Sequence, residues 1–300
     1  MPRVVAPNTG LELEYEDFGG SGEPLLLIMG LGAQLVHWPD GFCRELVARG
    51  FRVIRFDNRD VGLSSKIRGR VPDVRLLMGK RFLNRPFETP YTVLDMADDS
   101  AGLLEALEIP SAHIAGVSMG GMIAQTLAIT HPHKVRSLTS IMSSTGRRRF
   151  LIAKPRAAAI LVRRGPRNRE EAIDGEASFF RVCGGVREHA ADERLVRDIA
   201  ARAYDRCFHP AGFIRQLAGI LATPDRAPAL RYVRVPATVI HGSVDPLILP
   251  AAGRATAEAI PGARFRLVEN MGHDLPPSLW RTISEEITAV AGRGAERRRA

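Results

Sequence analysis

The sequence has 300 residues, of which 45% are hydrophobic and 25% charged, the composition of an ordinary folded protein with room for one domain or two. The N-terminus lacks the apolar core of a secretory signal, and no apolar run reaches membrane-spanning length, so we expect a cytoplasmic protein. Cys43, Cys183 and Cys207 lie far apart and show no metal-ligand spacing. They are therefore expected to be reduced thiols, and no metal site is predicted.

The net charge of +9 comes from one segment of the chain. Residues 147–234 hold 19 of the 42 Lys and Arg but only 10 of the 33 Asp and Glu, and the remainder is neutral. No basic stripe with interleaved aromatic residues is visible, which argues against a nucleic-acid partner. Two explanations stay open: the segment weakly attracts anionic substrates or membrane surfaces, or its arginines reflect the base composition of the gene.

Short apolar runs alternate with helical patterns through residue 146. Strands are predicted twice within residues 3–18 and at 25–29, 52–56, 111–117 and 135–142, and helices at 37–49, 91–108 and 122–130. The unbroken apolar run 25–29 is typical of a strand buried on both faces of a parallel sheet. The strand–helix–strand order indicates βαβ units. Residues 64–90, rich in charge, Gly and Pro, are expected to form a long excursion over the surface.

The pattern changes after residue 146, where a long segment with helical period and no predicted strand begins. Strands then return at 235–241 and 263–268, and helices at 254–260 and 278–291. We therefore predict a core of residues 1–146 and 235–292, a helical cap of residues 147–234 and a solvated basic tail of residues 293–300. An insertion at this point would cover the carboxyl ends of the strands, where open α/β sheets bind ligands.

Residues 116–120 read Gly-Val-Ser-Met-Gly and lie between a predicted strand and a predicted helix. This is the context of the G-x-S-x-G nucleophile elbow, in which a serine sits on a very tight turn. Gly116 and Gly120 would let neighbouring backbone pass close to Ser118 because they have no Cβ. The sequence thus predicts Ser118 as a nucleophile, against the alternative of a glycine-rich turn with a surface serine.

A serine nucleophile needs a base and a group that orients the base. Asp245 and His273 each follow a predicted strand, and the order Ser, Asp, His is that of the nucleophile-elbow enzymes. Asp274 remains a rival for the acid, and Asp245 could instead serve only a turn or helix cap. The other histidines considered as bases are His241, His37, His113 and His131.

Acyl transfer also requires donors for the developing oxyanion. The backbone N–H of Met119, next to the serine, is one candidate. The second should come from the loop after an early strand, and there the N–H of Leu31 follows Gly30, which permits a tight turn. A plain glycine turn is the alternative for this loop.

These motifs resemble the α/β-hydrolase superfamily over residues 4–292 apart from the cap. The stretches LIMGLGAQLVHW (27–38), VIRFDNRDVGLSS (53–65) and residues 116–121 are similar to bacterial esterases of the aclacinomycin-methylesterase type and to Lip-type carboxylesterases. The resemblance implies an α/β-hydrolase fold with the triad Ser118, Asp245 and His273 and the oxyanion donors Leu31 and Met119. Many relatives have His-Gly where this chain has Met29-Gly30, so the support of that loop by a histidine is in doubt.

The resulting hypothesis is a serine hydrolase that cleaves a carboxylic ester or thioester through an acyl-enzyme on Ser118, with no metal or organic cofactor. Apolar cap residues favour a largely apolar small-molecule substrate, although they could equally be the core of the cap itself (Phe179, Phe180, Phe208, Phe213, Leu217). A cofactor-free haloperoxidase or a C–C bond hydrolase would use the same triad, and a non-catalytic binding protein is the remaining alternative. The oligomeric state is not predicted.

Overall fold

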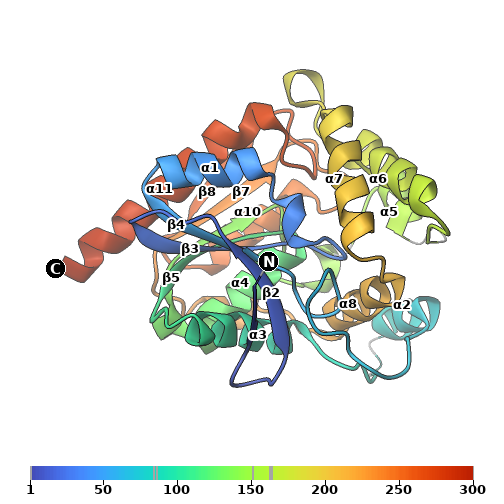
Figure 1. Cartoon of the computed structure of the whole chain (residues 1–300), viewed down its shortest axis with the longest axis horizontal. Coiled ribbons are helices and arrows are strands. Elements are labelled where there is room, and N and C mark those ends of the chain that lie inside the picture. The colour runs from blue at the N-terminus through green and yellow to red at the C-terminus, as the bar shows by residue number, and fades with distance from the viewer. Residues whose placement is uncertain (1, 84, 86, 151, 162–164, 300) are drawn as a thin grey trace.

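The computed structural model describes residues 2–83, 85, 87–150, 152–161 and 165–299, and a sheet of eight strands runs through its centre (Figure 1). The strand order is β1-β2-β4-β3-β5-β6-β7-β8. The strands are β1 (Arg3–Val5), β2 (Glu12–Asp17), β3 (Glu23–Ile28), β4 (Phe51–Phe56), β5 (Ala112–Val117), β6 (Val135–Ile141), β7 (Ala237–Gly242) and β8 (Arg264–Val268). Strands β3 to β8 run parallel and β1 and β2 antiparallel to their neighbours, which confirms the mostly parallel sheet.

Helices cover both faces of the sheet. One face carries α1 (Asp40–Ala48) and α11 (Pro277–Arg299), and the other carries α3 (Val93–Ala106), α4 (Met119–Thr130) and α10 (Pro250–Ala259). Strand β3 shows why its sequence is continuously apolar: Leu25 and Leu27 pack on the α1 side, whereas Leu26 and Ile28 pack on the α3 side. Alternate residues of one strand therefore belong to two hydrophobic cores.

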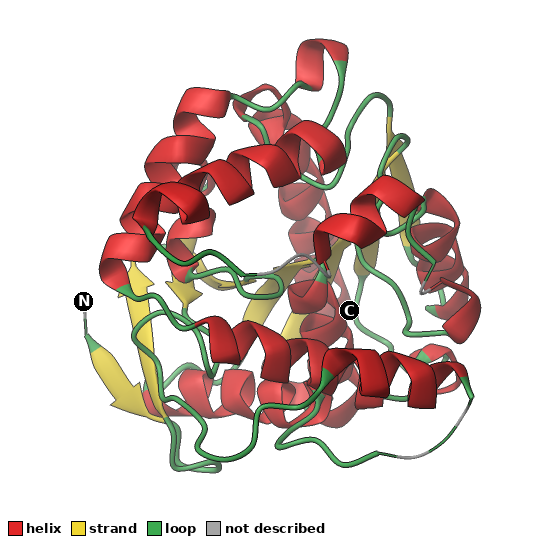
Figure 2. Ribbon diagram, turned by 90° about the vertical axis from the view of Figure 1, so that its right-hand side faces the viewer, coloured by secondary structure: helices red, strands yellow, loops and turns green. Residues whose placement is uncertain are grey.

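Among the described residues between β6 and β7, the regular elements are helices joined by loops. They form η3 (Arg148–Phe150), α5 (Pro155–Leu161), α6 (Arg169–Cys183), η4 (Arg187–His189), α7 (Glu193–Arg206), α8 (Pro210–Ala222) and α9 (Ala227–Leu230), where η denotes a short 3₁₀ helix. We call residues 147–234 the cap. Figure 2 views the molecule from the side on which α5 to α8 lie.

Two segments differ from the expectation. Residues 64–90 contain a helix, α2 (Val74–Phe82), which packs on α8 through the buried Leu77. This helix lacks a clear apolar period and contains Gly79, so its sequence does not stand out. The segment predicted as a solvated tail continues α11 through Arg299, while residue 300 lies outside the described residues. Arg293 side-chain hydrogen bonds to Ala237 O and Thr238 Oγ1 hold this part of the helix against β7.

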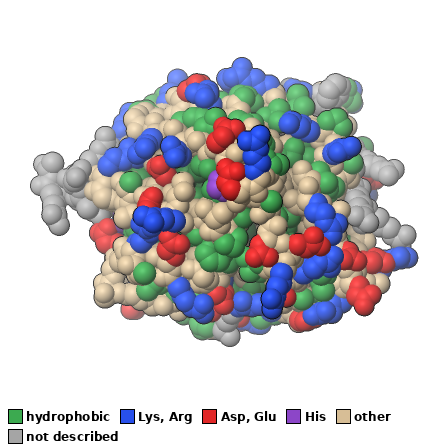
Figure 3. Space-filling view, turned by 90° about the horizontal axis from the view of Figure 1, so that it is seen from above, with side chains coloured by type: hydrophobic (Ala, Val, Ile, Leu, Met, Phe, Trp, Pro, Cys, Tyr) green, Lys and Arg blue, Asp and Glu red, His purple; other side chains and the backbone are tan. Residues whose placement is uncertain are grey.

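The arginines of the cap are extensively paired within the cap. Exposed ion pairs join Arg167 to Glu171, Arg169 to Asp205, Arg181 to Glu193 and Arg197 to Asp174. On the face seen in Figure 3, basic and acidic side chains are interspersed. Such exposed pairs are screened by water and contribute little to stability. Among the described helices, none is both long and apolar enough to cross a membrane.

Two further short elements complete the chain: the 3₁₀ helices η1 (Leu35–His37) and η2 (Pro132–Lys134). The first follows the loop after β3, and the second joins α4 to β6. Because β3 and β5 are adjacent parallel strands, the loop after β3 and the turn after β5 emerge at the same edge of the sheet. The cap insertion starts from the neighbouring strand at that edge, β6.

Candidate active site

Ser118 lies at the turn between β5 and α4, in a backbone conformation that is rarely adopted by residues other than glycine. Its φ is 55° and its ψ is −119°, outside the regions that side-chain sterics favour. A Cβ on Gly116 would collide with the carbonyl oxygen of Gly120, and a Cβ on Gly120 would collide with that of Ile28. The glycines of the motif therefore permit the turn, as expected for a nucleophile elbow.

The structure brings Ser118, His273 and Asp245 together. His273 Nε2 lies 3.0 Å from Ser118 Oγ, and His273 Nδ1 lies 2.7 Å from Asp245 Oδ2. Asp245 lies in the turn after β7 and His273 in the loop after β8, so all three residues follow the carboxyl ends of parallel strands. In this arrangement the imidazole can take the hydroxyl proton while the carboxylate orients the ring.

The two oxygens of Asp245 have different partners. Oδ1 accepts the backbone N–H groups of Leu247 and Ile248 at 2.8 and 3.0 Å. Oδ2 bonds to His273 and lies 3.4 Å from His241 Nε2. Burial disfavours the charge of Asp245, but the adjacent His273 and His241 hold the pKa of this carboxyl below its usual range. Asp245 therefore both stabilises the turn after β7 and hydrogen-bonds the imidazole of His273.

Asp274, the rival for the acid, has another partner. Its Oδ1 accepts the Gly185 N–H at 3.0 Å, and its buried Oδ2 has no partner within the described residues. Burial raises the pKa of the Asp274 carboxyl to about 7, and the charge of Asp245 adds to the rise, whereas the Gly185 N–H and His273 oppose it. Asp274 therefore belongs to the junction with the cap rather than to the proton relay.

The rival histidines also have other partners. His37 bonds to Glu176, His113 to Glu23 and Ser137, His131 to Asp98, and His241 to the carbonyl of Ile248. Of the histidines considered from the sequence, it is His273 that lies within hydrogen-bond distance of Ser118.

The candidate oxyanion donors lie on either side of Ser118. Neither the Leu31 nor the Met119 backbone N–H has a hydrogen-bond acceptor in the described parts of the chain. Gly30 lies against the serine: a Cβ placed on it would be 3.2 Å from Ser118 Cβ. Two free N–H groups beside a nucleophile are what a developing oxyanion requires.

The loop that carries Leu31 is held by side chains that the sequence did not single out. Asn58 Nδ2 donates to Met29 O at 3.0 Å, and Gln216 Oε1 accepts the Gly32 N–H at 2.8 Å. Asn58 belongs to the polar turn after β4, whereas Gln216 is fully buried on α8 of the cap. The sequence left the support of this loop in doubt because Met29 replaces a histidine, and an asparagine of the core and a glutamine of the cap hydrogen-bond to the loop here.

A cavity of about 650 Å³ opens above Ser118 and His273. Its cap wall is largely apolar and includes four of the five residues proposed from the sequence: Phe179, Phe180, Phe213 and Leu217. The fifth, Phe208, does not line this cavity; its ring stacks near that of Tyr204, with centroids 4.9 Å apart. In the described part of the chain, no group of three or more His, Cys, Asp or Glu residues is arranged to hold a metal ion.

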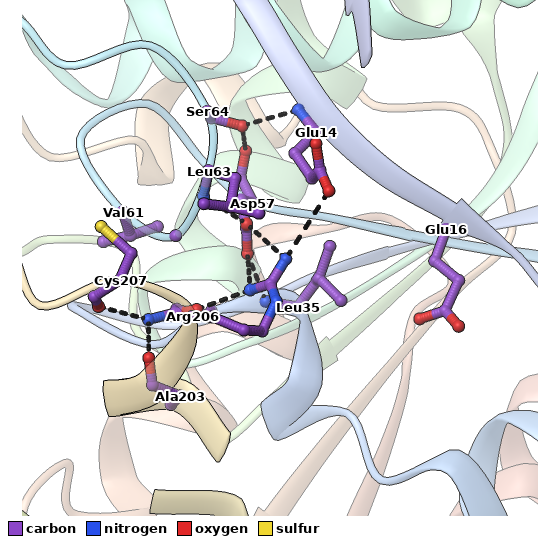
Figure 4. Close-up of polar contacts among 12 residues, drawn as sticks. Glu14, Glu16, Leu35, Asp57, Val61, Leu63, Ser64, Ala203, Arg206 and Cys207 are labelled. Carbon is purple, nitrogen blue, oxygen red and sulfur yellow. Dashed lines mark hydrogen bonds and ion pairs between the residues drawn. The ribbon is translucent and has the colours of Figure 1, made fainter. Parts of the chain in front are cut away.

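Buried ionic contacts hold the cap to the core. Figure 4 shows Arg206, at the end of α7, reaching Asp57, which lies in the turn after β4, with Arg206 Nη2 3.1 Å from Asp57 Oδ2. Arg215 on α8 binds both oxygens of Asp60, at 2.8 and 2.9 Å, and Tyr91 donates to the same carboxylate. The polar turn after β4 therefore fixes the cap to the core.

The fold and this site define the class of the protein. The sequence matches the model of the alpha/beta hydrolase fold family over residues 23–277, and the chain belongs to that family.

Individual relatives span nearly the whole chain. The rhodomycin D methylesterase DnrP of Streptomyces peucetius is 28% identical and is aligned over 96% of this chain and 98% of its own. The 2-hydroxymuconate semialdehyde hydrolase of Pseudomonas sp. strain CF600 is 27% identical over 88% of this chain and 84% of its own. Among solved structures, the enol-lactonase of Burkholderia xenovorans LB400 superposes with a TM-score of 0.70 at 23% identity, covering 98% of this chain and 100% of its own.

Proposed function

We propose that this hydrolase cleaves carboxylic esters or thioesters through an acyl-enzyme on Ser118. The observation that carries the proposal is the continuous relay from Ser118 Oγ through His273 to Asp245, with distances of 3.0 and 2.7 Å. The similarity to a methylesterase over almost the full chain supports ester hydrolysis in particular.

In this mechanism His273 Nε2 takes the proton of Ser118 as the oxygen attacks the ester carbonyl. The tetrahedral oxyanion accepts hydrogen bonds from the Leu31 and Met119 N–H groups. On collapse, the alcohol or thiol leaves with the proton from His273, and the acyl group stays on Ser118. Water then attacks the acyl-enzyme with His273 as base, which releases the acid and restores the serine. Asp245 accepts a hydrogen bond from the Nδ1–H of His273 throughout and stabilises the imidazolium.

The substrate that best fits the cavity is a small molecule with a substantial apolar part. The volume of about 650 Å³ lies within the range typical of small-molecule sites. Phenylalanine and leucine side chains of the cap would bury the apolar part, while Ser118 and His273 contact the reacting carbonyl. No metal or organic cofactor is part of the proposed reaction.

The first test is hydrolysis of p-nitrophenyl esters of increasing acyl length by the wild type and by Ser118→Ala. We expect turnover by the wild type and a loss of at least about 10³-fold in the variant, because the acyl acceptor is removed. Circular dichroism should show that the variant is folded, since alanine adopts the strained turn no less readily than serine. Retained turnover would place the nucleophile elsewhere.

A second candidate is a C–C bond hydrolase that uses the same triad, favoured by the similarity to the semialdehyde hydrolase. Labelling of Ser118 by a fluorophosphonate, without turnover of any simple ester, would favour this candidate or a haloperoxidase. Cleavage of a vinylogous diketone would then indicate the C–C hydrolase, and bromination in the presence of peroxide and bromide the haloperoxidase. Absence of both labelling and turnover would indicate a non-catalytic binding protein.

A further inference from the structure

The loop that carries His273 is hydrogen-bonded directly to the cap. We call residues 183–189, from the end of α6 through η4, the cap turn, and residues 269–276 the histidine loop. The N–H of His273 itself donates to Cys183 O at 2.6 Å, and the N–H of Val186 donates to Asn270 O at 2.9 Å. The backbone of the proposed base is therefore tied to the inserted segment.

Glycines allow the two backbones to touch. A Cβ on Gly272 of the histidine loop would collide with the backbone of Gly184 in the cap turn. A Cβ on Gly184 would collide with Phe180 O and would lie only 2.9 Å from Asp274 Oδ2. Because no flexible side chain separates the cap turn from the histidine loop, a shift of one is transmitted to the other.

Asp274 completes this junction and is the residue next to His273. Its carboxyl is 6% exposed, accepts the Gly185 N–H through Oδ1 and leaves Oδ2 without a partner in the described chain. The titratable groups that face it are His273 and Asp245 from the core and Cys183 from the cap. Burying a carboxyl with a hydrogen bond to only one of its two oxygens costs folding free energy, so a purely structural role would not favour it.

We propose that Asp274 and the cap turn position His273 from the cap side, as Asp245 orients it from the core side. The cap then helps to hold the catalytic base, His273, in position. The inference rests on the proposed hydrolytic function, because it assigns Asp274 as a positioning residue for that reaction.

The test compares Asp274→Ala with Asp274→Asn in p-nitrophenyl ester hydrolysis. Alanine removes the acceptor for the Gly185 N–H, so kcat should fall about 10- to 100-fold with KM little changed, as for a misplaced catalytic group. Asparagine keeps an acceptor oxygen and should restore most of kcat. Both the loss in Asp274→Ala and its recovery in Asp274→Asn should appear in kcat rather than in KM, which a general loss of stability would not produce.

Arg202→Ala is the matched control, since Arg202 also joins the cap to the core through Asp40 but lies on α7, away from the histidine loop. It should leave kcat and KM unchanged. Wild-type kcat in Asp274→Ala would overturn the inference while the hydrolase stands.

The proposed function has a separate readout. If Ser118→Ala retains turnover, or if the wild type neither turns over esters nor reacts with a fluorophosphonate, the hydrolase itself fails. Should Asp274→Ala not fold, the near-isosteric variants Asp274→Asn and Asp274→Leu decide: retained kcat in the first with a loss in the second supports the inference, and equal kcat in both overturns it.

Discussion

At the scale of single residues, Asp245 and Asp274 show how burial alone does not determine what a carboxyl does. Both are buried near His273, yet the pKa of Asp245 is held low by the histidines beside it, whereas that of Asp274 is raised to about 7. The difference follows from the partners: Asp245 Oδ2 bonds to the imidazole, and Asp274 Oδ2 has no partner among the described residues.

Asp245→Asn should lower kcat for ester hydrolysis by about 10⁴-fold with little change in fold, because an amide favours the wrong tautomer of His273. The amide oxygen can still accept the Leu247 and Ile248 N–H groups, so the turn should persist. Steady-state kinetics with p-nitrophenyl acetate measure the effect. A larger loss in Asp274→Asn than in Asp245→Asn would reverse the assignment of the acid.

At the scale of elements, the strand–turn–helix unit around Ser118 depends on close backbone contacts. Gly120→Ala should destabilise the protein by about 3 kcal/mol, because the new Cβ would collide with Ile28 O, a backbone atom that cannot rotate away. Urea unfolding measures the loss.

Gly175→Ala is the matched control for the elbow variant. Gly175 lies within α6, and a Cβ there has no atom within 4 Å. This substitution should stabilise the protein by about 0.5–1 kcal/mol, as expected for a helix interior. Equal effects at the two glycines would show that the elbow is not tightly packed.

The elements that the sequence predicted well are those with a local signal. The apolar run of β3, the glycines around Ser118 and the polar turns after β7 and β8 each leave a pattern within a few residues of chain. Helix α2 was missed because its sequence has no apolar period, and among its described side chains Leu77 alone is buried against α8. The end of α11 was missed because a charged, glycine-containing sequence is typical of a tail.

The contacts between cap and core could not be predicted from the sequence. Arg206 meets Asp57 across 149 residues, and Gln216 meets Gly32 across 184. The sequence around Arg206 does not indicate Asp57 as its partner, because the chain contains many arginines. The sequence around Gln216 is that of an ordinary amphipathic helix and does not indicate Gly32. The triad was predictable because each member follows a strand, whereas the side chains that support the oxyanion loop depend on how the cap is seated.

At the scale of the whole molecule, buried ion pairs fix the cap over the sheet. Arg215→Met should lower the free energy of unfolding by about 3–5 kcal/mol, because the buried carboxylate of Asp60 would lose the guanidinium that binds both of its oxygens. Arg169→Met removes an exposed pair within the cap, with Arg169 48% and Asp205 56% exposed, and should leave the free energy of unfolding nearly unchanged. Chemical denaturation of both variants measures the difference, and similar losses would contradict the role given to Asp60.

During synthesis, Ser118 and its elbow leave the ribosome well before the acid and the base. Strands β7 and β8, which precede Asp245 and His273, form one edge of the sheet, and α11 closes the face that it shares with α1. Until those strands arrive, β6 has a free edge and the serine lacks the imidazole that would activate it. The unfinished chain is therefore expected to be inert toward the esters of the cell, and the proposed activity begins only when the C-terminal part of the core has folded.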